Sequence, residues 1–170
     1  QRTRPLTVHM PEEGLIPVRR MLDASYIFEE LMPCELNFTG ITVSDPFEVA
    51  GIRVTPHHTS HLDQLKEHFA KKYPAKYEAF SFLLESEEAR VAHSADIGGL
   101  ADLDPLLSQP VDLLVCELAH VEPKELFTYL AEKEVGQVAF MHLSRPYRKK
   151  LDELKAQAKS ILGNLPHTFL

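Results

Sequence analysis

Three short polar segments of this chain combine histidine with aspartate or serine, and imidazole with carboxylate is the ligand set of zinc and similar divalent metals. The segments are Thr55-Pro-His-His-Thr-Ser-His61, His93-Ser-Ala-Asp96-Ile-Gly-Gly99 and Phe140-Met-His-Leu-Ser144. Each follows or caps a short apolar run, so each is expected at a strand end, where an α/β fold presents its site residues. The pattern predicts part of a metal-dependent hydrolase.

Asp96 lies among small residues, because Ala95 precedes it and two glycines follow at 98 and 99. Glycine permits tight turns and close approach, and the two carboxylate oxygens accept independently, so Asp96 is a candidate for bridging two metal ions. The alternative is that Asp96 caps the helix that follows, which is a frequent use of aspartate. The segment by itself leaves both interpretations open.

Several histidines are candidates for the imidazole ligands. The histidine-rich turn offers His57, His58 and His61. His142 ends an apolar run, so it is either a ligand or a core histidine that hydrogen-bonds a backbone carbonyl. His120 also follows an apolar run, and it is interpreted as a partner of a ligand or as an additional site residue.

Composition limits the class of protein. A chain of 170 residues with 44% apolar residues is one domain or a large piece of one. No apolar run approaches the roughly 18 residues that span a membrane. The cysteines, Cys34 and Cys116, suit a reduced cytoplasm, and Cys116 is expected as a buried thiol in a strand. Phosphate loops of the Walker type, dinucleotide-binding glycine motifs and serine nucleophile elbows are absent from the sequence.

The net charge of -7 argues against a general nucleic-acid binder, which normally has a basic surface. A local basic patch nevertheless follows His142, at Arg145, Arg148, Lys149 and Lys150. This patch has three interpretations: it holds a substrate phosphate, it binds RNA, or it is a solvated basic face.

Hydrophobic periodicity predicts an alternation of strands and helices. Strands are expected at residues 6–9, 36–43, 47–54, 78–85, 89–93, 111–116 and 138–141. Helices are expected at residues 11–31, 61–69, 100–107, 123–133 and 147–162. Sheet pairs followed by strand–helix units indicate an α/β sandwich rather than an all-β or helical fold.

The order of histidine turn, hairpin, Ser-Ala-Asp, strand, helix, strand and histidine resembles the metallo-β-lactamase superfamily. It looks most like the branch that contains ribonuclease Z and related phosphodiesterases. His142-Leu-Ser-Arg-Pro-Tyr147 is similar to that branch's His-x-Ser-x-Arg-Tyr, and Asp112-Leu-Leu-Val-Cys-Glu117 resembles its penultimate core strand. The resemblance covers nearly the whole chain.

The resemblance implies an α/β (α+β) fold of the metallo-β-lactamase type, an αββα sandwich. It also implies two divalent metal ions, most readily zinc, that activate water to hydrolyse a phosphodiester or another ester. His58 or His61 would bind one ion, Asp96 would be the bridging catalytic carboxylate, His142 would bind the other ion, and Arg145 would orient a substrate phosphate. Thr55-Pro-x-His58 fits the commoner spacing, whereas His61 fits variants that read Thr-x-His-Leu.

The sequence departs from the superfamily pattern in two places. The superfamily's His-x-His-x-Asp-His motif is absent from these residues, and the usual glycine before the aspartate is Ala95. Residues 1–170 are therefore expected to be the carboxyl-terminal part of a single domain, a hydrolase when an amino-terminal half is present. Missing strands would expose apolar sheet surface, so self-association or a complementary amino-terminal segment is expected.

The alternative function is a non-catalytic α/β module for assembly or binding, whose histidines are remnants of a metal site. An intact upstream His-x-His-x-Asp-His motif would favour the enzyme, and a degenerate one would favour the module.

Overall fold

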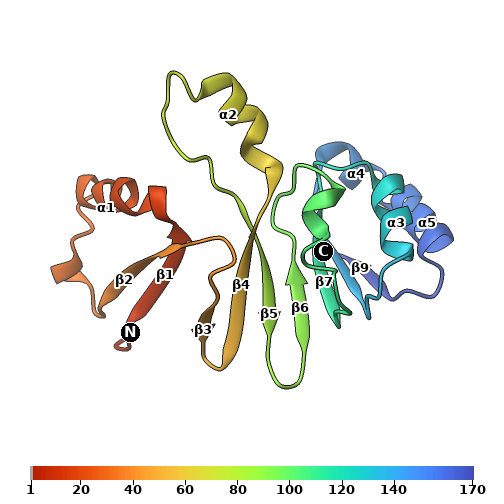
Figure 1. Cartoon of the computed structure of the whole chain (residues 1–170), viewed down its shortest axis with the longest axis horizontal. Helices are drawn as coiled ribbons and strands as arrows, with labels where there is room; N and C mark the ends of the chain where they lie inside the picture. Colours follow the sequence, from red (N-terminus) through yellow and green to blue (C-terminus); the bar gives the residue numbers. More distant parts are fainter. Residues whose placement is uncertain (1) are drawn as a thin grey trace.

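The computed structural model describes residues 2–170 and contains a seven-stranded sheet beside a separate two-stranded sheet (Figure 1). The strands are β1 (Leu6–Pro11), β2 (Leu36–Ile41), β3 (Phe47–Val49), β4 (Ile52–His58), β5 (Phe80–Glu85), β6 (Arg90–His93), β7 (Leu113–Leu118), β8 (Val138–Leu143) and β9 (His167–Phe169). The α-helices are α1 (Leu15–Ala24), α2 (Asp63–Phe69), α3 (Pro123–Ala131), α4 (Arg145–Lys149) and α5 (Leu151–Leu162). Short 3-10 helices are η1 (Glu12–Gly14), η2 (Glu29–Leu31), η3 (Ser60–Leu62) and η4 (Leu100–Leu103). This mixed architecture confirms the expected fold class.

The pairing of strands in the seven-stranded sheet changes once, from antiparallel to parallel. Its order is β3-β4-β5-β6-β7-β8-β9, antiparallel from β3 to β6 and parallel from β6 to β9. Strands β4, β6, β7 and β8 therefore run in the same direction, and their carboxyl ends lie at one edge of the sheet. In open α/β sheets this is the edge where ligands bind.

Four predicted elements differ from the structure. The helix expected at residues 100–107 is only the 3-10 helix η4, and residues 104–107 form turns. The strand expected at residues 47–54 is a hairpin, because Ala50 and Gly51 turn with φ values of 52° and 81°, the left-handed conformations of a tight two-residue turn. The helix expected at 147–162 is divided into α4 and α5, since Lys150 leaves the helical region at φ -120° and ψ 35°. The helix expected at 11–31 is shorter, because the backbone of Tyr26, with φ 59°, follows the end of α1.

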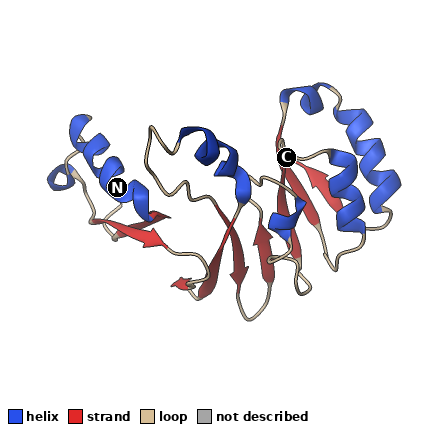
Figure 2. Ribbon diagram, turned by 45° about the horizontal axis from the view of Figure 1, so that its top comes forward, coloured by secondary structure: helices blue, strands red, loops and turns tan. Residues whose placement is uncertain are grey.

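One face of the large sheet is covered by α3 and α5, which lie beside the carboxyl-terminal strands (Figure 2). Leu114 of β7 and Phe140 of β8 are fully buried there, with Phe127 of α3 and Leu154 of α5 in the same cluster. The rings of Phe127 and Phe140 pack with centroids 5.1 Å apart. Each such aromatic side chain contributes about 3–5 kcal/mol relative to alanine, so this half of the sheet is a rigid support.

The opposite face of the same sheet is less covered. Leu83 and Ala92 are buried toward the helices, whereas Phe82, Leu84 and Val115, which alternate with that row, are only half-buried. Parallel strands are normally covered on both faces. The face is therefore an apolar surface of the kind that a further layer covers.

The amino-terminal unit, formed by β1, α1 and β2, lies beside β3 and apart from β7 to β9 (Figures 1 and 2). The His9 ring stacks on Phe47 with centroids 4.0 Å apart. The Glu13 carboxylate accepts hydrogen bonds from the backbone N–H groups of Lys76 and Glu78. Helix α1 has no buried residue, so the unit is held mainly by these contacts.

No helix within residues 2–170 is both long and apolar enough to cross a membrane.

Cys116 has no exposed surface in β7, which confirms the buried thiol, and burial raises its pKa to about 12.

We expect iodoacetamide at pH 8 to alkylate half-buried Cys34 and to reach Cys116 about a thousandfold more slowly, because the thiolate is the nucleophile. Intact-mass measurements with and without urea check this, and Cys34→Ser should remove the native labelling. Rapid native labelling of Cys116 would contradict the packing of β7.

Candidate metal centre

Three side chains that are far apart in the sequence converge at the carboxyl edge of the large sheet. One potential ligand atom from each of His61, Asp96 and His120 lies within 4.8 Å of the others. His61 follows β4, Asp96 follows β6, and His120 follows β7. The convergence results from the common direction of these strands, which brings their ends to one place.

Asp96 also faces a fourth candidate, His142. One carboxylate oxygen, Oδ2, lies 4.0 Å from His61 Nε2, and the other, Oδ1, lies 3.8 Å from His142 Nε2. The His120 ring lies near both imidazoles, with centroids 4.6 Å from His61 and 5.6 Å from His142. The carboxylate thus presents a different oxygen to each of two histidines, the arrangement that a bridging ligand requires.

The histidine-rich turn divides its three members among three environments. His61 belongs to the converging group, whereas His58 is exposed at the end of β4, in register with Phe80. His57 is half-buried, and burial lowers its pKa. Of the two residues left open by the sequence, the geometry favours His61.

The structure does not have Asp96 as a helix cap or His142 as a core histidine, the two alternatives to metal binding. Gly99, not Asp96, occupies the N-cap position of η4, and no side chain caps it. The side chain of His142 is 51% exposed, which differs from a core histidine. Metal binding by these residues stays a prediction.

The backbone is strained at two positions of the site. Ala95 and His142 have φ values of 47° and 50°, in the left-handed region that favours glycine. For Ala95 this conformation costs about 1–2 kcal/mol. His142 lies where the pairing of β7 with β8 shifts register between Glu117 and Leu118, and such a bulge redirects a side chain.

Asp102 joins the two loops that carry His61 and Asp96. Its Oδ2 accepts hydrogen bonds from the backbone N–H and the hydroxyl of Ser60, at 3.0 and 2.9 Å, and from the N–H of Gly98 at 2.8 Å. Sequence reasoning missed Asp102, and no local pattern identifies it, since Ser60 lies 42 residues upstream.

Glu117 was also missed as a site residue, although its carboxylate is 1% exposed beside the centre. It accepts hydrogen bonds from the backbone N–H groups of Ile97, Ala119 and His120 and from Nδ1 of His120, at 2.6–3.1 Å. A glutamate among apolar residues of a strand is the available sequence signal, because a buried carboxylate must find donors.

Two cavities reach the centre. One, of about 420 Å³, is lined by His61, Asp96 and His142 with Phe80 and Met141. The other, of about 450 Å³, lies between α2 and the Asp96 loop and is lined by residues that include His61, His120, Leu65, Phe69 and Ile97. A small molecule therefore has access to the histidines from either side.

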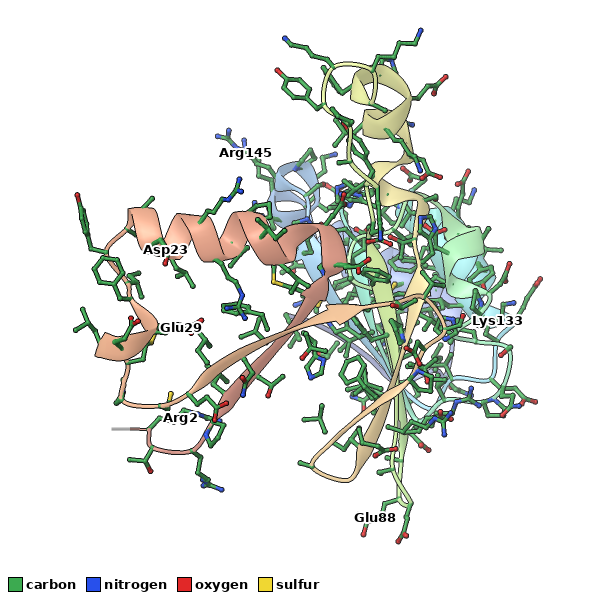
Figure 3. The ribbon with its side chains drawn as sticks, turned by 60° about the vertical axis from the view of Figure 1, so that its left-hand side comes forward. Arg2, Asp23, Glu29, Glu88, Lys133 and Arg145 are labelled. Atoms are coloured by element: carbon green, nitrogen blue, oxygen red, sulfur yellow. The ribbon has the colours of Figure 1, made fainter. Side chains whose placement is uncertain are left out.

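Arg145 lines neither of these two cavities. It is exposed on α4, and Figure 3 shows its side chain extending outward from that helix. A substrate that reached both Arg145 and the centre would have to extend beyond the cavities.

The donor set fits a divalent metal ion. Imidazole nitrogens and a carboxylate are the ligands of zinc and related ions, and here they lie close together. The side chains that carry them are partly exposed, 26% for His61 and 45% for Asp96, so an ion can reach them. The loops that carry them are held together by hydrogen bonds through Asp102.

Gly98→Ala should separate these loops, because a Cβ there would lie 2.6 Å from the carbonyl carbon and oxygen of Ser60 and would also meet its Oγ. We expect a loss of about 1–3 kcal/mol in the free energy of unfolding in urea. Gly99→Ala is the matched control, since it is extended and nothing lies within 4 Å of its Cβ position, so it should change stability by less than about 0.5 kcal/mol. Equal stability of the two variants would show that the close approach at Gly98 does not exist.

Solved structures with low sequence identity share this fold. The metallo-β-lactamase fold protein YhfI from Bacillus subtilis is 15% identical, with a TM-score of 0.67 over 98% of this chain and 62% of that one. Zn²⁺-bound PqqB from Methylobacterium extorquens is 15% identical, with a TM-score of 0.58 over 98% of this chain and 60% of that one. A possible metal-dependent hydrolase from Veillonella parvula is 12% identical, with a TM-score of 0.60 over 99% of this chain and 64% of that one. This chain therefore spans less than two thirds of the length of each.

A search of curated proteins finds no match to the chain. The family model described as the beta-lactamase superfamily domain, however, matches residues 1–148. With its strand order, its helical layer and the convergence of His61, Asp96 and His142 at one sheet edge, the chain belongs to the metallo-β-lactamase superfamily.

Proposed function

We propose that this chain is part of a metal-dependent hydrolase in which His61, Asp96 and His142 bind divalent metal ions, with zinc as the expected metal. The observation that carries the proposal is the Asp96 carboxylate, which directs one oxygen toward His61 and the other toward His142. Zinc is the metal in one structural neighbour, PqqB, and another neighbour is described as a possible metal-dependent hydrolase.

A divalent metal held by His61, Asp96 and His142 would supply Lewis acidity for hydrolysis. The chain's own residues provide the binding and the shape. His61 and His142 hold their imidazoles on either side of Asp96, and Phe80 and Met141 form apolar wall in the adjoining cavity. Apolar walls limit the access of water, which strengthens the electrostatic interactions within the site.

The proposed substrate is a phosphodiester or another ester. The positive charges of α4, the helix that follows His142, support a substrate that carries a phosphate. These charges are Arg145, Arg148 and Lys149. Because Arg145 points outward, its proposed role is to hold a part of the substrate remote from the reacting bond.

A complementary amino-terminal segment is proposed to complete the hydrolase. Two observations support this proposal. The sheet face that carries Phe82, Leu84 and Val115 is apolar and only half-buried. The chain also covers only 62% of the length of YhfI. A segment that covered this face would be in position to add ligands to the centre, and the superfamily's His-x-His-x-Asp-His motif is of the right type.

The full-length gene product is the protein on which hydrolysis should be measured, with bis(p-nitrophenyl) phosphate and p-nitrophenyl acetate as substrates. His61→Ala and Asp96→Asn should lower kcat/KM by about 100-fold or more, because each removes a direct ligand. His58→Ala should retain most of the activity, since His58 lies outside the converging group.

Chelation with EDTA should abolish hydrolysis, and added zinc should restore it. Activity that persists without metal would refute the proposal. A large loss in His58→Ala with little loss in His61→Ala would reverse the assignment of the ligand. Absence of hydrolysis in a correctly folded, metal-loaded protein would favour the non-catalytic module.

A further inference from the structure

Glu117 is an ionisable side chain that the proposed function does not use, and it lies directly beside the centre. Its carboxylate is 1% exposed, and the residue is the penultimate one of β7. A buried carboxylate is retained only where donors replace water. Oε1 accepts hydrogen bonds from the Ile97 N–H at 3.1 Å and from His120 Nδ1 at 2.9 Å. Oε2 accepts them from the N–H groups of Ala119 at 2.6 Å and His120 at 3.0 Å.

The contact with Nδ1 determines the tautomer of His120. The Glu117 carboxylate already accepts three backbone N–H groups, so we assign it as the acceptor of this contact as well and place the ring proton on Nδ1. The other ring nitrogen, Nε2, then keeps its lone pair and is available as a ligand. A carboxylate that holds the distal nitrogen of an imidazole is the usual support for a histidine that binds metal, because it orients the ring and raises its basicity.

The same carboxylate holds the loop of Asp96. Ile97, whose N–H it accepts, is the next residue after Asp96. The backbone N–H of Glu117 also donates to Ser94 Oγ at 3.0 Å, and that hydroxyl donates to the carbonyl of Ala95 at 2.7 Å. Glu117 therefore sets the position of His120 and of Asp96 together.

We propose that His120, oriented by Glu117, is a metal ligand, and that His61, Asp96 and His120 form a site for one divalent ion within this chain. The inference deepens the proposed function and rests on its metal binding by His61 and Asp96. Three protein ligands with a remaining open position are the usual set of a catalytic zinc site. The ligand atoms of these three residues already lie within 4.8 Å of one another. Glu117 is a positioning residue in this site, since it acts through His120.

Titration of the 170-residue chain with Co²⁺ tests the site, with isothermal calorimetry for affinity and visible absorption for coordination. The expected stoichiometry is one ion per chain. His120→Ala should weaken binding by about 10- to 100-fold. His68→Ala is the matched control and should bind as the unaltered chain does, because His68 is an exposed histidine on α2 outside the converging group.

Glu117→Gln separates positioning from general stability. In the metal-free chain, ¹⁵N NMR of the imidazole should report a proton on Nδ1 of His120. The glutamine amide cannot accept at both of its ends, so the variant should shift the proton toward Nε2 and weaken Co²⁺ binding by about 10-fold or more. If Glu117→Gln does not fold, His120→Ala still decides the assignment, since it leaves the three backbone donors to Glu117 in place.

The outcomes distinguish the two proposals. Equal Co²⁺ affinity in His120→Ala and the unaltered chain would overturn the assignment of His120 and leave the hydrolase proposal intact. Failure of the unaltered chain to bind one ion would overturn the single-chain site, whereas hydrolysis by the full-length gene product could still succeed. Binding that depends on His120, in a protein without hydrolytic activity, would support this inference and refute the proposed function.

Discussion

The parallel alignment of β6, β7 and β8 is the constraint on which the candidate site depends. Their common direction brings Asp96, His120 and His142 to one edge of the sheet, although these residues are spread over 47 positions of the chain. The strands cannot shift easily, because α3 and α5 cover one face with fully buried side chains such as Phe127 and Ala158. Close packing of this kind transmits position from the core to the loops at its edge.

Hydrogen bonds to two carboxylates then fix the positions of the loops that carry the site residues. Asp102 holds Ser60 and Gly98, while Glu117 holds Ile97 and His120. Each carboxylate accepts several backbone N–H groups, which offsets the cost of removing it from water. The two carboxylates bind the backbone N–H groups of Ile97 and Gly98, the two residues that follow Asp96, so this loop is held at consecutive positions.

The two faces of the large sheet differ in a way that is relevant to function. Helices α3 and α5 cover one face along the carboxyl-terminal strands, whereas the opposite face carries half-buried apolar residues, and the amino-terminal unit lies beside β3. This chain covers only 60–64% of the length of the three solved structures compared above. The candidate centre lies at the edge of this partly covered face, where a further segment could add ligands to it.

The sequence by itself determined the class of fold and pointed to the segments whose histidines and aspartate converge in the structure. Strand alternation, the hairpin before Asp96 and the histidines after apolar runs all depend on residues a few positions apart, so local periodicity predicts them. The hairpin at Ala50 and Gly51, the break at Lys150 and the early end of α1 before Tyr26 were missed, because single backbone conformations decide them. The strand β9 and the restriction of the helix expected at 100–107 to η4 were missed as well.

The tertiary structure decided which of those segments act together. His58 and His61 are alike in sequence context, and the separation appears only when η3 redirects the chain after β4 and brings His61 toward Asp96. Asp102 and Glu117 have partners 42 and 20 residues away, which no local pattern encodes. The physical reason is that strand-end side chains meet through sheet register and loop packing, and these are set by contacts between distant parts of the chain.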